Sequence, residues 1–523
     1  MQRASTTHTL NGSGWLLKAC VFATGMSGIV AEYVMSTLAG YLLGNEVVQF
    51  ALVISVMLFA MGLGSRLSRR IEKDLLDSFI VLELTLALLC GVSALSVYAL
   101  AFSYAFVGVA IYAFAFAIGL LIGLEIPLVT RVNGRYEKLS VNVSSVMEHD
   151  YYGSLLGGLL FAFIALPYLG LTYTPIVLGA VNGLVATVLF VRYRSAFRYR
   201  RALSVAVALT PIVLSGLALS ARPIVLYGEQ RGYRDPVVYT EQSRYQKLVM
   251  TEWRGDHWFY LNGSLQFSTL DEARYHEPLV HPALGLAAAR TRVLLLGAGD
   301  GLAAREVLKY SDVEHVTLVD LDPAVTNLAR SHPVLREQNR GSLDDPRVEV
   351  VSGDAYGYLE RSGELFDVII ADFPDPKSIS LARLYSVQFY RLVNRHLGPG
   401  GVFVTQATSP FFSQQAFLSI LKTVGAAGFV SVPYHNHVPT LGEWGFVLGL
   451  KPPEGRSLSS GALKGALERQ TFGVTTQFLN ADAMKHMLNF GKTELVGLSD
   501  IPVSTELNHA VAELYRSGRW DLN

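Results

Sequence analysis

The sequence predicts an N-terminal α-helical transmembrane bundle and a C-terminal α/β domain with a Rossmann-like, doubly wound sheet, preceded by a small antiparallel β domain. Three observations predict this class. The 523 residues are 51% hydrophobic and only 16% charged, whereas an ordinary soluble protein is about 25% charged. Long uncharged stretches precede residue 222, and short hydrophobic runs alternate with helical segments after residue 290. We expect domains at 1–222, 223–289 and 290–523.

The charge balance gives no indication of a polyanionic partner. The chain has 43 Lys and Arg against 43 Asp and Glu, so we expect no nucleic acid to bind. Residues 1–222 nevertheless carry 15 basic and 10 acidic residues, while residues 223–523 carry 28 and 33. The two cysteines, Cys20 and Cys90, lie in apolar runs. We therefore expect neither a disulfide framework nor a thiolate metal site, and no metal.

Charge-free stretches predict most of the membrane spans. No Lys, Arg, Asp or Glu occurs between Glu83 and Glu125 or between Asp150 and Arg192, and each gap is 41 residues long. A helix of that length measures about 60 Å, which is two crossings of a ~30 Å bilayer core. Three further apolar runs bring the count to about seven spans, at 15–40, 47–65 and 203–221. The first is too long for a cleaved signal peptide. We expect a multi-pass protein of the inner cell membrane, with the lipid bilayer as a partner.

Basic loop residues predict the orientation of the bundle. Twelve of the 15 basic residues before 222 lie in three loops on one side, at 65–74, 131–138 and 192–201. The positive-inside rule makes that side cytoplasmic. If 203–221 crosses the membrane, the C-terminal domain emerges on the opposite side. Pro211 and Gly216 are compatible with a re-entrant or interfacial segment instead.

Three carboxylates, Glu32, Glu83 and Glu125, lie in or at the ends of the apolar helices. A carboxylate in lipid is costly and often functional, so a site for a cationic solute is one interpretation, with Glu32 its best candidate. A paired or protonated helix contact is the other. The spacing Gly153-x-x-x-Gly157 is typical of close helix packing.

The residues from 237 to about 270 predict the small antiparallel β domain. Alternating segments occur at 237–239, 247–253 and 258–261, with turn residues at 254–256 and 262–263 between and after them. A helical segment from Asp271 to Pro282 leads into the next domain.

The residues from 292 to 450 alternate between strand-like and helical segments. Strands are expected at 292–296, 315–319, 347–351, 366–371 and 401–406. Repeated units of this kind form a parallel sheet that binds ligands at the carboxyl ends of its strands. Four of those ends carry acids, namely Asp300, Asp320, Asp354 and Asp372.

A glycine-rich loop after the first strand and an acid after the second predict a nucleoside site. Gly297, Gly299 and Gly301 would let the backbone approach the ligand, and Asp320 would bind the two ribose hydroxyls. Enzymes that use NAD and enzymes that use adenosylmethionine share this pattern. The ring of acids favours a cationic sulfonium, because Asp300 would repel a pyrophosphate. The alternative for Asp300 is simple capping of the following helix.

From about residue 237 to 523 the sequence resembles the spermidine/spermine synthases, the polyamine aminopropyltransferases. The matching motifs, in order, are Tyr245-Gln246; Leu261-Asn262-Gly263 with Gln266; Asp271-Glu272 with Tyr275-His276-Glu277 and His281-Pro282; Gly297 to Gly301 with Arg305-Glu306; Val319 to Asp322; Gly353-Asp354-Ala355; Asp372 to Pro376; Phe389-Tyr390; Gln406; and Gly445-Phe446. With seven spans in front, the chain resembles the bacterial branch that carries an N-terminal membrane domain.

The resemblance implies transfer of the aminopropyl group of decarboxylated adenosylmethionine to an amine such as putrescine, giving spermidine and methylthioadenosine, with no further cofactor. A primary amine with a pKa near ~10 is protonated at neutral pH and needs a carboxylate that accepts a proton. By motif position, Asp372 is that base. The other implied contacts are Asp375 with an amine nitrogen, Asp300 with the aminopropyl ammonium, Asp320 with the ribose, Asp354 and Ala355 with the adenine, Gln246 with the thionucleoside, Tyr275 and His276 with the amine, and Gln266 with substrate.

The acceptor side departs from the family pattern. After the Asp-Pro turn the sequence reads Lys377-Ser378-Ile379-Ser380 in place of a Gly-Pro pair, and Leu441 stands where the family offers a tyrosine. The identity of the amine is therefore open. For His276, the alternative is a packing histidine. For the whole protein, the alternatives are an adenosylmethionine-dependent methyltransferase and a polyamine transporter or sensor with a synthase-like domain.

Two further expectations concern assembly and location. We expect a homodimer. Because decarboxylated adenosylmethionine is made in the cytosol, we expect the catalytic domain to be cytoplasmic and 203–221 not to cross fully.

Overall fold

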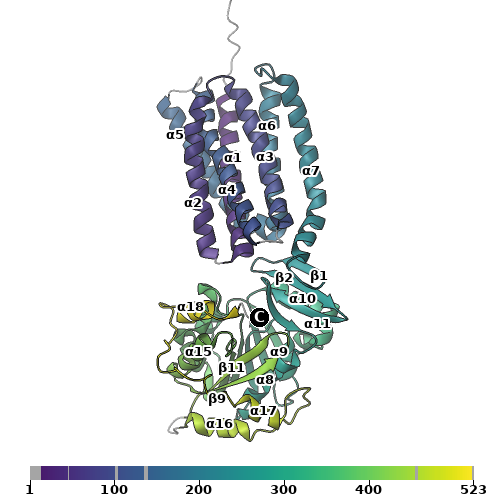
Figure 1. The fold of residues 1–523 in the computed structure, drawn as a ribbon, viewed down its shortest axis with the longest axis vertical. Helices are drawn as coiled ribbons and strands as arrows, with labels where there is room; N and C mark the ends of the chain where they lie inside the picture. The colour runs from purple at the N-terminus through teal and green to yellow at the C-terminus, as the bar shows by residue number, and fades with distance from the viewer. Residues whose placement is uncertain (1–12, 45, 101–103, 135–138, 454–457, 521–523) are drawn as a thin grey trace, which may run out of the picture. The chain divides into compact units, whose positions relative to one another are not determined.

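The computed structural model describes residues 13–44, 46–100, 104–134, 139–453 and 458–520. The chain divides into two compact units, Met1–Val237 and Val238–Asn523 (Figure 1). The first unit is helical, and the second contains all the strands of the described residues.

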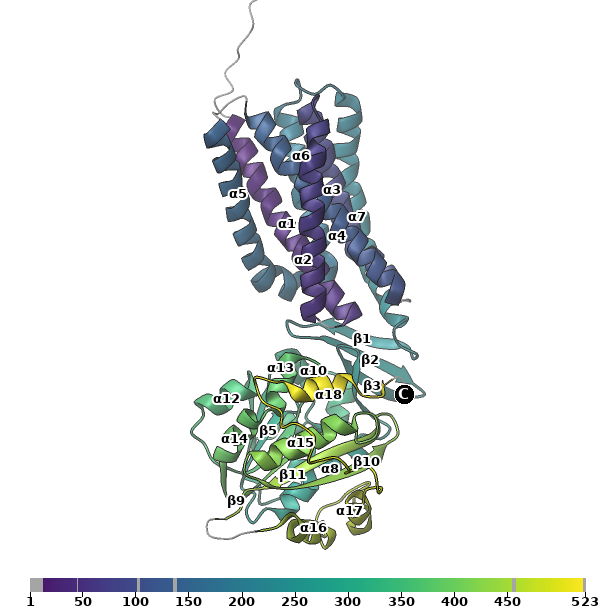
Figure 2. The same ribbon diagram turned by 60° about the vertical axis from the view of Figure 1, so that its left-hand side comes forward.

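The first unit consists of long apolar helices that pack side by side (Figures 1 and 2). They are α1 (Ser13–Leu43), α2 (Glu46–Leu67), α3 (Leu75–Ala99), α4 (Tyr104–Asn133), α5 (Leu139–Leu160) continued by the π-helical η2 (Phe161–Leu169), α6 (Gly170–Arg192) and α7 (Arg200–Gln230). Six stretches are long and apolar enough to cross a membrane, and the one at Ser140–Arg192 holds α5, η2 and α6. The bundle predicted from the charge-free stretches is thus present.

Glycines let the helices approach closely. A Cβ on Gly153 would lie 2.0 Å from the carbonyl oxygen of Phe22, and one on Gly157 would lie 2.5 Å from that of Met26. Both distances are far below any tolerated contact, so α5 packs backbone to backbone against α1. The packing role predicted for the Gly153-x-x-x-Gly157 spacing is confirmed.

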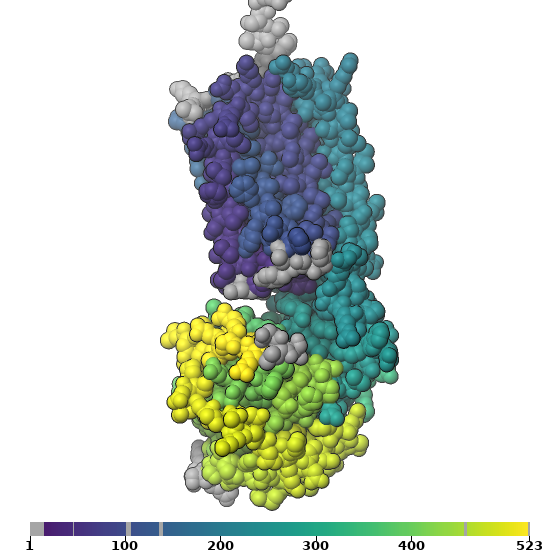
Figure 3. All heavy atoms as spheres, viewed as in Figure 1, coloured from purple at the N-terminus to yellow at the C-terminus, as the bar shows by residue number. Residues whose placement is uncertain are grey.

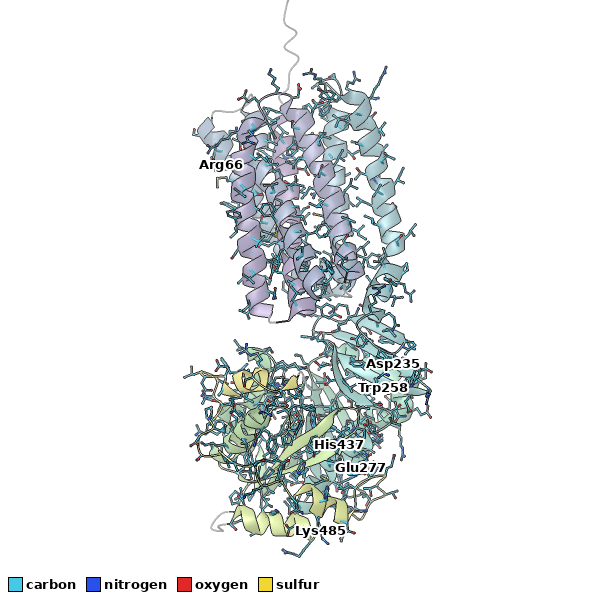
Figure 4. The ribbon with its side chains drawn as sticks, in the orientation of Figure 1. Arg66, Asp235, Trp258, Glu277, His437 and Lys485 are labelled. Atoms are coloured by element: carbon cyan, nitrogen blue, oxygen red, sulfur yellow. The ribbon has the colours of Figure 1, made fainter. Side chains whose placement is uncertain are left out.

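The basic loops come together at one end of the bundle. Arg131 donates hydrogen bonds to the carbonyl oxygens of Ile71 and Ser68, each at 2.8 Å, and Arg198 binds Asp74 at 3.1 Å. Figure 4 labels Arg66 near this end. Arg135 and Lys138, which belong to the same predicted loop set, lie outside the described residues.

The α7 helix corrects one expectation. We expected 203–221 to stop short of a full crossing at Pro211 and Gly216, but Arg200–Gln230 is one uninterrupted helix of 31 residues, long and apolar enough to span. It begins at the end with the basic loops, and Gly228 packs against the last turn of α3 at Tyr98. A proline inside a long membrane helix is tolerated because neighbouring helices support the freed backbone groups.

Two of the three membrane carboxylates are buried together. Glu83 and Glu125 are 0% and 3% exposed and close enough to interact electrostatically. Glu125 accepts a hydrogen bond from Thr24, whereas neither oxygen of Glu83 has a partner among the described residues. Glu32 is more exposed than either. The cationic-solute site centred on Glu32 stays a prediction.

The second unit begins with the expected small antiparallel sheet. Its strands are β1 (Val237–Gln242), β2 (Lys247–Trp253), β3 (Asp256–Leu261) and β4 (Ser264–Ser268), in that spatial order. The helix α8 (Ala273–Leu286) follows.

The main sheet has seven strands in the order β10-β11-β9-β8-β5-β6-β7. They are β5 (Arg292–Gly297), β6 (His315–Asp320), β7 (Val348–Ser352), β8 (Phe366–Asp372), β9 (Leu397–Gln406), β10 (Val430–Val438) and β11 (Gly442–Leu450). The five strands predicted from the sequence are parallel to one another. The sheet is mixed, however, because the unpredicted hairpin β10–β11 adds two antiparallel strands at one edge.

Alternating side chains of the central strand β5 face two hydrophobic cores. Val293 and Leu295 belong to one core and Leu294 and Leu296 to the other, and all four are 0% exposed. The helices in the first core include α8, α9 (Leu302–Val307), α10 (Pro323–Ser331), α16 (Ser460–Glu468) and α17 (Ala481–Met487). Those in the second include α12 (Ala355–Arg361), α14 (Val387–Arg395), α15 (Gln414–Ala426) and α18 (Ala510–Arg516). The sheet is therefore doubly wound.

Candidate active site

The site lies where the chain order reverses in the sheet. Strand β5 is hydrogen-bonded to β6 on one side and to β8 on the other, and ligands of doubly wound sheets bind at such a switch point. Asp320 and Asp372 are the last residues of β6 and β8, and Asp300 follows β5. The structure thus brings together three of the predicted acids.

The loop after β5 has room only for glycine at two positions. Gly297 has φ +79°, and a Cβ there would lie 2.2 Å from the carbonyl oxygen of Asp372. A Cβ on Gly299 would lie 2.5 Å from Asp320 Oδ2. Gly301, with φ +82°, precedes α9 and packs against Ser342. The loop thus lies directly against Asp372 and Asp320, and its predicted contact with a nucleoside stays a prediction.

Asp320 is held by backbone donors at the end of β6. Its two oxygens accept hydrogen bonds from the N–H groups of Gly299 at 3.0 Å and Asp322 at 2.9 Å. Burial, with the nearby charges of Asp300 and Asp322, raises the pKa of Asp320 to about 6 despite these bonds. A ligand that brings hydroxyl donors would stabilise the charged form.

Asp372 is the centre of the cluster. Tyr275 donates a hydrogen bond of 2.6 Å from its hydroxyl to Asp372 Oδ1. Burial and the charge of Asp300 raise the pKa of Asp372 to about 6, while the positive charge of His276 and the bond from Tyr275 act in the opposite direction. A carboxylate with this pKa is mostly ionised at neutral pH and can still accept a proton.

His276 is buried beside Glu272, and its predicted contact with the amine stays a prediction. It is 1% exposed, and its Nδ1 lies 2.9 Å from Glu272 Oε2. Burial lowers the pKa of His276, but the bond to Glu272 outweighs burial and raises it to about 9, with smaller contributions from Asp300 and Asp372. Its positive charge therefore faces the acids at neutral pH.

Asp300 lies at the start of α9 and beside the other acids, and its contact with the aminopropyl ammonium stays a prediction. Its Oδ1 accepts a hydrogen bond of 2.8 Å from the N–H of Leu302, so it caps the start of α9. Burial still raises its pKa, and its charge influences both Asp320 and Asp372. Acids that raise one another's pKa favour a cationic ligand, because a cation between them relieves the repulsion.

Asp375 lies after β8 in the segment Asp372-Phe373-Pro374-Asp375-Pro376. Its Oδ2 accepts a hydrogen bond of 2.9 Å from the hydroxyl of Tyr515, and burial raises its pKa. Its Oδ1 is buried and makes no hydrogen bond of acceptable geometry with the described residues. An unsatisfied buried acceptor of this kind suits an ammonium donor.

The remaining predicted residues lie at the edges of this cluster. Asp354 is exposed and caps α12 by accepting from the N–H of Gly357 at 2.9 Å, while Ala355 is buried. Gln246 follows Ser243, whose hydroxyl binds Asp322 Oδ2 at 2.6 Å and so ties that loop to the end of β6. Gln266 donates to the carbonyl oxygen of Ser264 at 3.0 Å. No described contact joins these residues to the three central acids.

Sequence reasoning missed two groups of supporting residues. Glu272 accepts from Arg305 at 2.9 Å and from His276, which lowers the pKa of Glu272 to about 2 despite burial. Glu272 and Arg305 both belong to motifs that carry the family resemblance, and this was the signal in the sequence that could have identified their supporting role. Tyr515 lies 140 residues from Asp375, and nothing in its local sequence marks it.

One buried cluster has the composition of a metal site. Ligand atoms of Glu277, His281 and Glu306 lie within 4.8 Å of one another. The side-chain atoms of these residues already make hydrogen bonds and ion pairs within the protein, however. Glu277 accepts from the backbone N–H groups of Gln477, Phe478 and Leu479. Glu306 binds Arg305, Lys309 and His281. The cations Arg305 and Lys309 disfavour a metal here, and the cluster anchors the segment 477–479.

The fold and the site define a doubly wound α/β protein whose acidic centre, at the ends of β5, β6 and β8, suits a cationic ligand. Comparison with known proteins identifies its family. Residues 272–457 match the family model of the spermine/spermidine synthase domain. The chain is 44% identical over 438 residues to polyamine aminopropyltransferase 2 of Aquifex aeolicus, covering 84% of this chain and 88% of that protein.

A second relative extends the match across almost the whole chain. Polyamine aminopropyltransferase 2 of Ralstonia nicotianae is 41% identical over 495 residues, which is 92% of this chain and 94% of the relative. The solved spermidine synthase of Thermotoga maritima is 28% identical and covers 50% of this chain and 87% of its own, with a TM-score of 0.44. The chain belongs to the polyamine aminopropyltransferase family, and it is an aminopropyltransferase of the spermidine synthase type. The methyltransferase alternative is set aside.

Proposed function

We propose that this protein moves the aminopropyl group of decarboxylated adenosylmethionine to a diamine such as putrescine, with Asp372 as the base. The observation that supports this most directly is the position of Asp372. It ends β8 at the switch point, accepts a hydrogen bond from Tyr275 at 2.6 Å, and has its pKa raised to about 6 by burial.

The proposed reaction is a single displacement. The neutral amine nitrogen attacks the aminopropyl carbon next to the sulfonium, the carbon–sulfur bond breaks, and its electron pair stays on sulfur to give neutral methylthioadenosine. The proton that the attacking nitrogen of the protonated diamine must lose passes to Asp372 and from there to solvent, and the product leaves as the secondary ammonium. No cofactor besides the co-substrate is needed.

The nucleoside side of the proposal uses the ends of β5, β6 and β7. Asp320 binds the ribose hydroxyls, and the Gly297–Gly301 loop lets the backbone approach the nucleoside. Asp354 and Ala355 contact the adenine, and Gln246 contacts the thionucleoside. Asp300 binds the aminopropyl ammonium. Because ordinary adenosylmethionine carries a carboxylate in that region, Asp300 would repel it, which is specificity through repulsion.

The acceptor side uses Asp372 together with Asp375. Asp375 holds an amine nitrogen, Tyr275 and His276 lie beside Asp372, and Gln266 contacts substrate. Tyr275 supports this assignment by its hydrogen bond to Asp372. His276, held by Glu272, lines the path of the amine beside Tyr275.

The test is turnover by the purified full-length protein in detergent. With decarboxylated adenosylmethionine and a panel of diamines and triamines, methylthioadenosine should appear in equal amount to the extended amine. Asp372→Asn should lower kcat by roughly 10²–10⁴ and leave methylthioadenosine affinity unchanged. Binding of both substrates without turnover by the wild type would contradict the proposal and favour a sensor or transporter.

We further propose that the protein is embedded in the inner cell membrane, with the catalytic unit on the side opposite the basic loops. An odd number of crossings, as α1 to α7 would make with α5 and α6 counted separately, puts the two ends of the bundle on opposite sides, and α7 starts at the basic end. The positive-inside rule makes that end cytoplasmic. The cytoplasmic placement expected from the origin of the nucleoside stays the alternative, and it requires 203–221 not to cross. The proposed placement requires a source of the nucleoside on the outer side.

We also propose a homodimer, which light scattering on the detergent-purified protein tests. A mass of one chain after subtraction of detergent would contradict it.

A further inference from the structure

We infer that Tyr515, from the C-terminal helix α18, is a positioning residue that orients Asp375 toward the acceptor amine and helps to select which amine is used. This inference rests on the acceptor role proposed for Asp375. It goes beyond that role by assigning amine selection to a segment about 140 residues further along the chain.

The contact between the two residues is direct. The Tyr515 hydroxyl donates to Asp375 Oδ2 at 2.9 Å, and Tyr515 is only 5% exposed. A carboxylate that accepts from a fixed hydroxyl cannot rotate freely, so its second oxygen has a defined direction. A hydrogen bond to a charged group contributes more than one between neutral groups.

Two polar atoms beside this contact are left without partners. Asp375 Oδ1 and Thr408 Oγ1 are both buried and make no hydrogen bond of acceptable geometry among the described residues, although Thr408 is near enough to Asp375 to affect its charge. Buried polar groups are nearly always satisfied. The side chains of Thr408 and Gln406 also lie near enough to Asp375 to stabilise its charged form. A buried carboxylate oxygen with a hydroxyl beside it suits a nitrogen that carries several N–H groups, as the end of a protonated diamine does.

The C-terminal segment holds Tyr515 firmly. The rings of Tyr515 and Trp520 lie 4.7 Å apart, and Trp520 stacks on Phe412 at 5.7 Å. The Trp520 indole N–H donates to the carbonyl oxygen of Tyr515 at 2.9 Å, and the backbone N–H of Arg519 donates to the carbonyl oxygen of Phe412 at 2.7 Å. Figure 2 shows α18 beside α15, and Figure 3 shows the C-terminal residues, in yellow, on the surface of this unit. The ring therefore stays in place when its hydroxyl is removed.

The hydroxyl at the tip of the hairpin β10–β11, on Thr440, donates to Asp271 Oδ1 at 2.8 Å and so does not bind Asp375. Leu441 is apolar and 9% exposed there, and Trp444 near Tyr275 has an indole N–H, which cannot accept from an ammonium. Among the described residues, the tyrosine hydroxyl that binds Asp375 is thus supplied by the end of the chain.

The experiment compares Tyr515→Phe with a matched control, Tyr434→Phe. The control also removes one buried hydroxyl, which donates to the carbonyl oxygen of Pro278 at 2.9 Å without contacting a site carboxylate. In the full-length protein, Tyr515→Phe should raise KM for the best diamine about tenfold while KM for decarboxylated adenosylmethionine stays the same. It should also change the ranking of diamines of different length. Tyr434→Phe should change neither KM.

Asp375→Asn and the double variant separate this inference from the proposed function. If Tyr515 acts through Asp375, the two effects on amine KM should be clearly less than additive. An unchanged amine KM in Tyr515→Phe, with a raised one in Asp375→Asn, would overturn the inference and leave the proposed function intact. If Asp375→Asn has no effect on amine KM, the proposed acceptor role itself fails. Equal rises of both substrates' KM in Tyr515→Phe would show a merely structural role and also overturn the inference.

Discussion

The pH dependence of the reaction should report the ionisation of Asp372. Its pKa in the free enzyme is raised from its usual value of 3.8 to about 6 by burial and by Asp300. The base must be ionised to accept a proton, so activity is present above this pKa and is lost as the pH falls through it. About nine-tenths of a group with a pKa of 6 is ionised at pH 7 and about one-tenth at pH 5, which predicts a roughly tenfold fall in kcat/KM.

The slope of the acidic limb carries further information. The pKa of Asp320 is also raised to about 6, and an ionised Asp320 is expected for nucleoside binding. If both groups must be ionised, kcat/KM falls more steeply with pH than it does for a single group. The fall over the same pH interval then approaches a hundredfold. Bound cationic substrates stabilise the charged carboxylates and so lower their pKa values. The fall in kcat should therefore occur at lower pH than the fall in kcat/KM.

The assay measures methylthioadenosine release between about pH 5 and pH 8 at saturating and at low substrate, with return to neutral pH as a check on irreversible loss. The variant Asp320→Asn removes one of the two groups and should reduce the slope of the kcat/KM limb to that of a single ionisation. A profile that is flat down to pH 5, or a steep limb that persists unchanged in Asp320→Asn, would refute the reasoning.

Three further outcomes follow from individual contacts. Asp320→Ala should weaken methylthioadenosine binding about tenfold or more in calorimetry, because each hydrogen bond to a charged group contributes about 1.5–3 kcal/mol; unchanged affinity would remove Asp320 from the site. Gly299→Ala, whose Cβ would lie 2.5 Å from Asp320 Oδ2, should displace that carboxylate and raise KM for the nucleoside substrate more than KM for the amine. In a cysteine-free background, a cysteine at exposed Ser459 should react with an impermeant thiol reagent in intact cells, and one at exposed Ser195 in a basic loop should be protected. The reverse labelling would put the catalytic unit in the cytoplasm.

Local sequence was sufficient for the parts of the protein that depend on local physics. Charge-free stretches identify membrane helices because lipid penalises every charge in a span. The five parallel strands are recognisable as short apolar runs, and the acids that follow them meet because parallel strands end at one edge of the sheet. Gly297 and Gly299 lie next to Asp372 and Asp320 for that reason. The central part of the site was therefore predictable.

The contacts decided only by tertiary structure join residues far apart in the chain. Tyr515 reaches Asp375 across 140 residues, and Ser243 reaches Asp322 across 79. Neither contact leaves a periodic pattern in the sequence, because each depends on where a helix or loop packs on the finished sheet. The antiparallel hairpin β10–β11 and the uninterrupted α7 were missed for a related reason. Pairing at a sheet edge and support of a proline by neighbouring helices are properties of the surroundings and not of the segment itself.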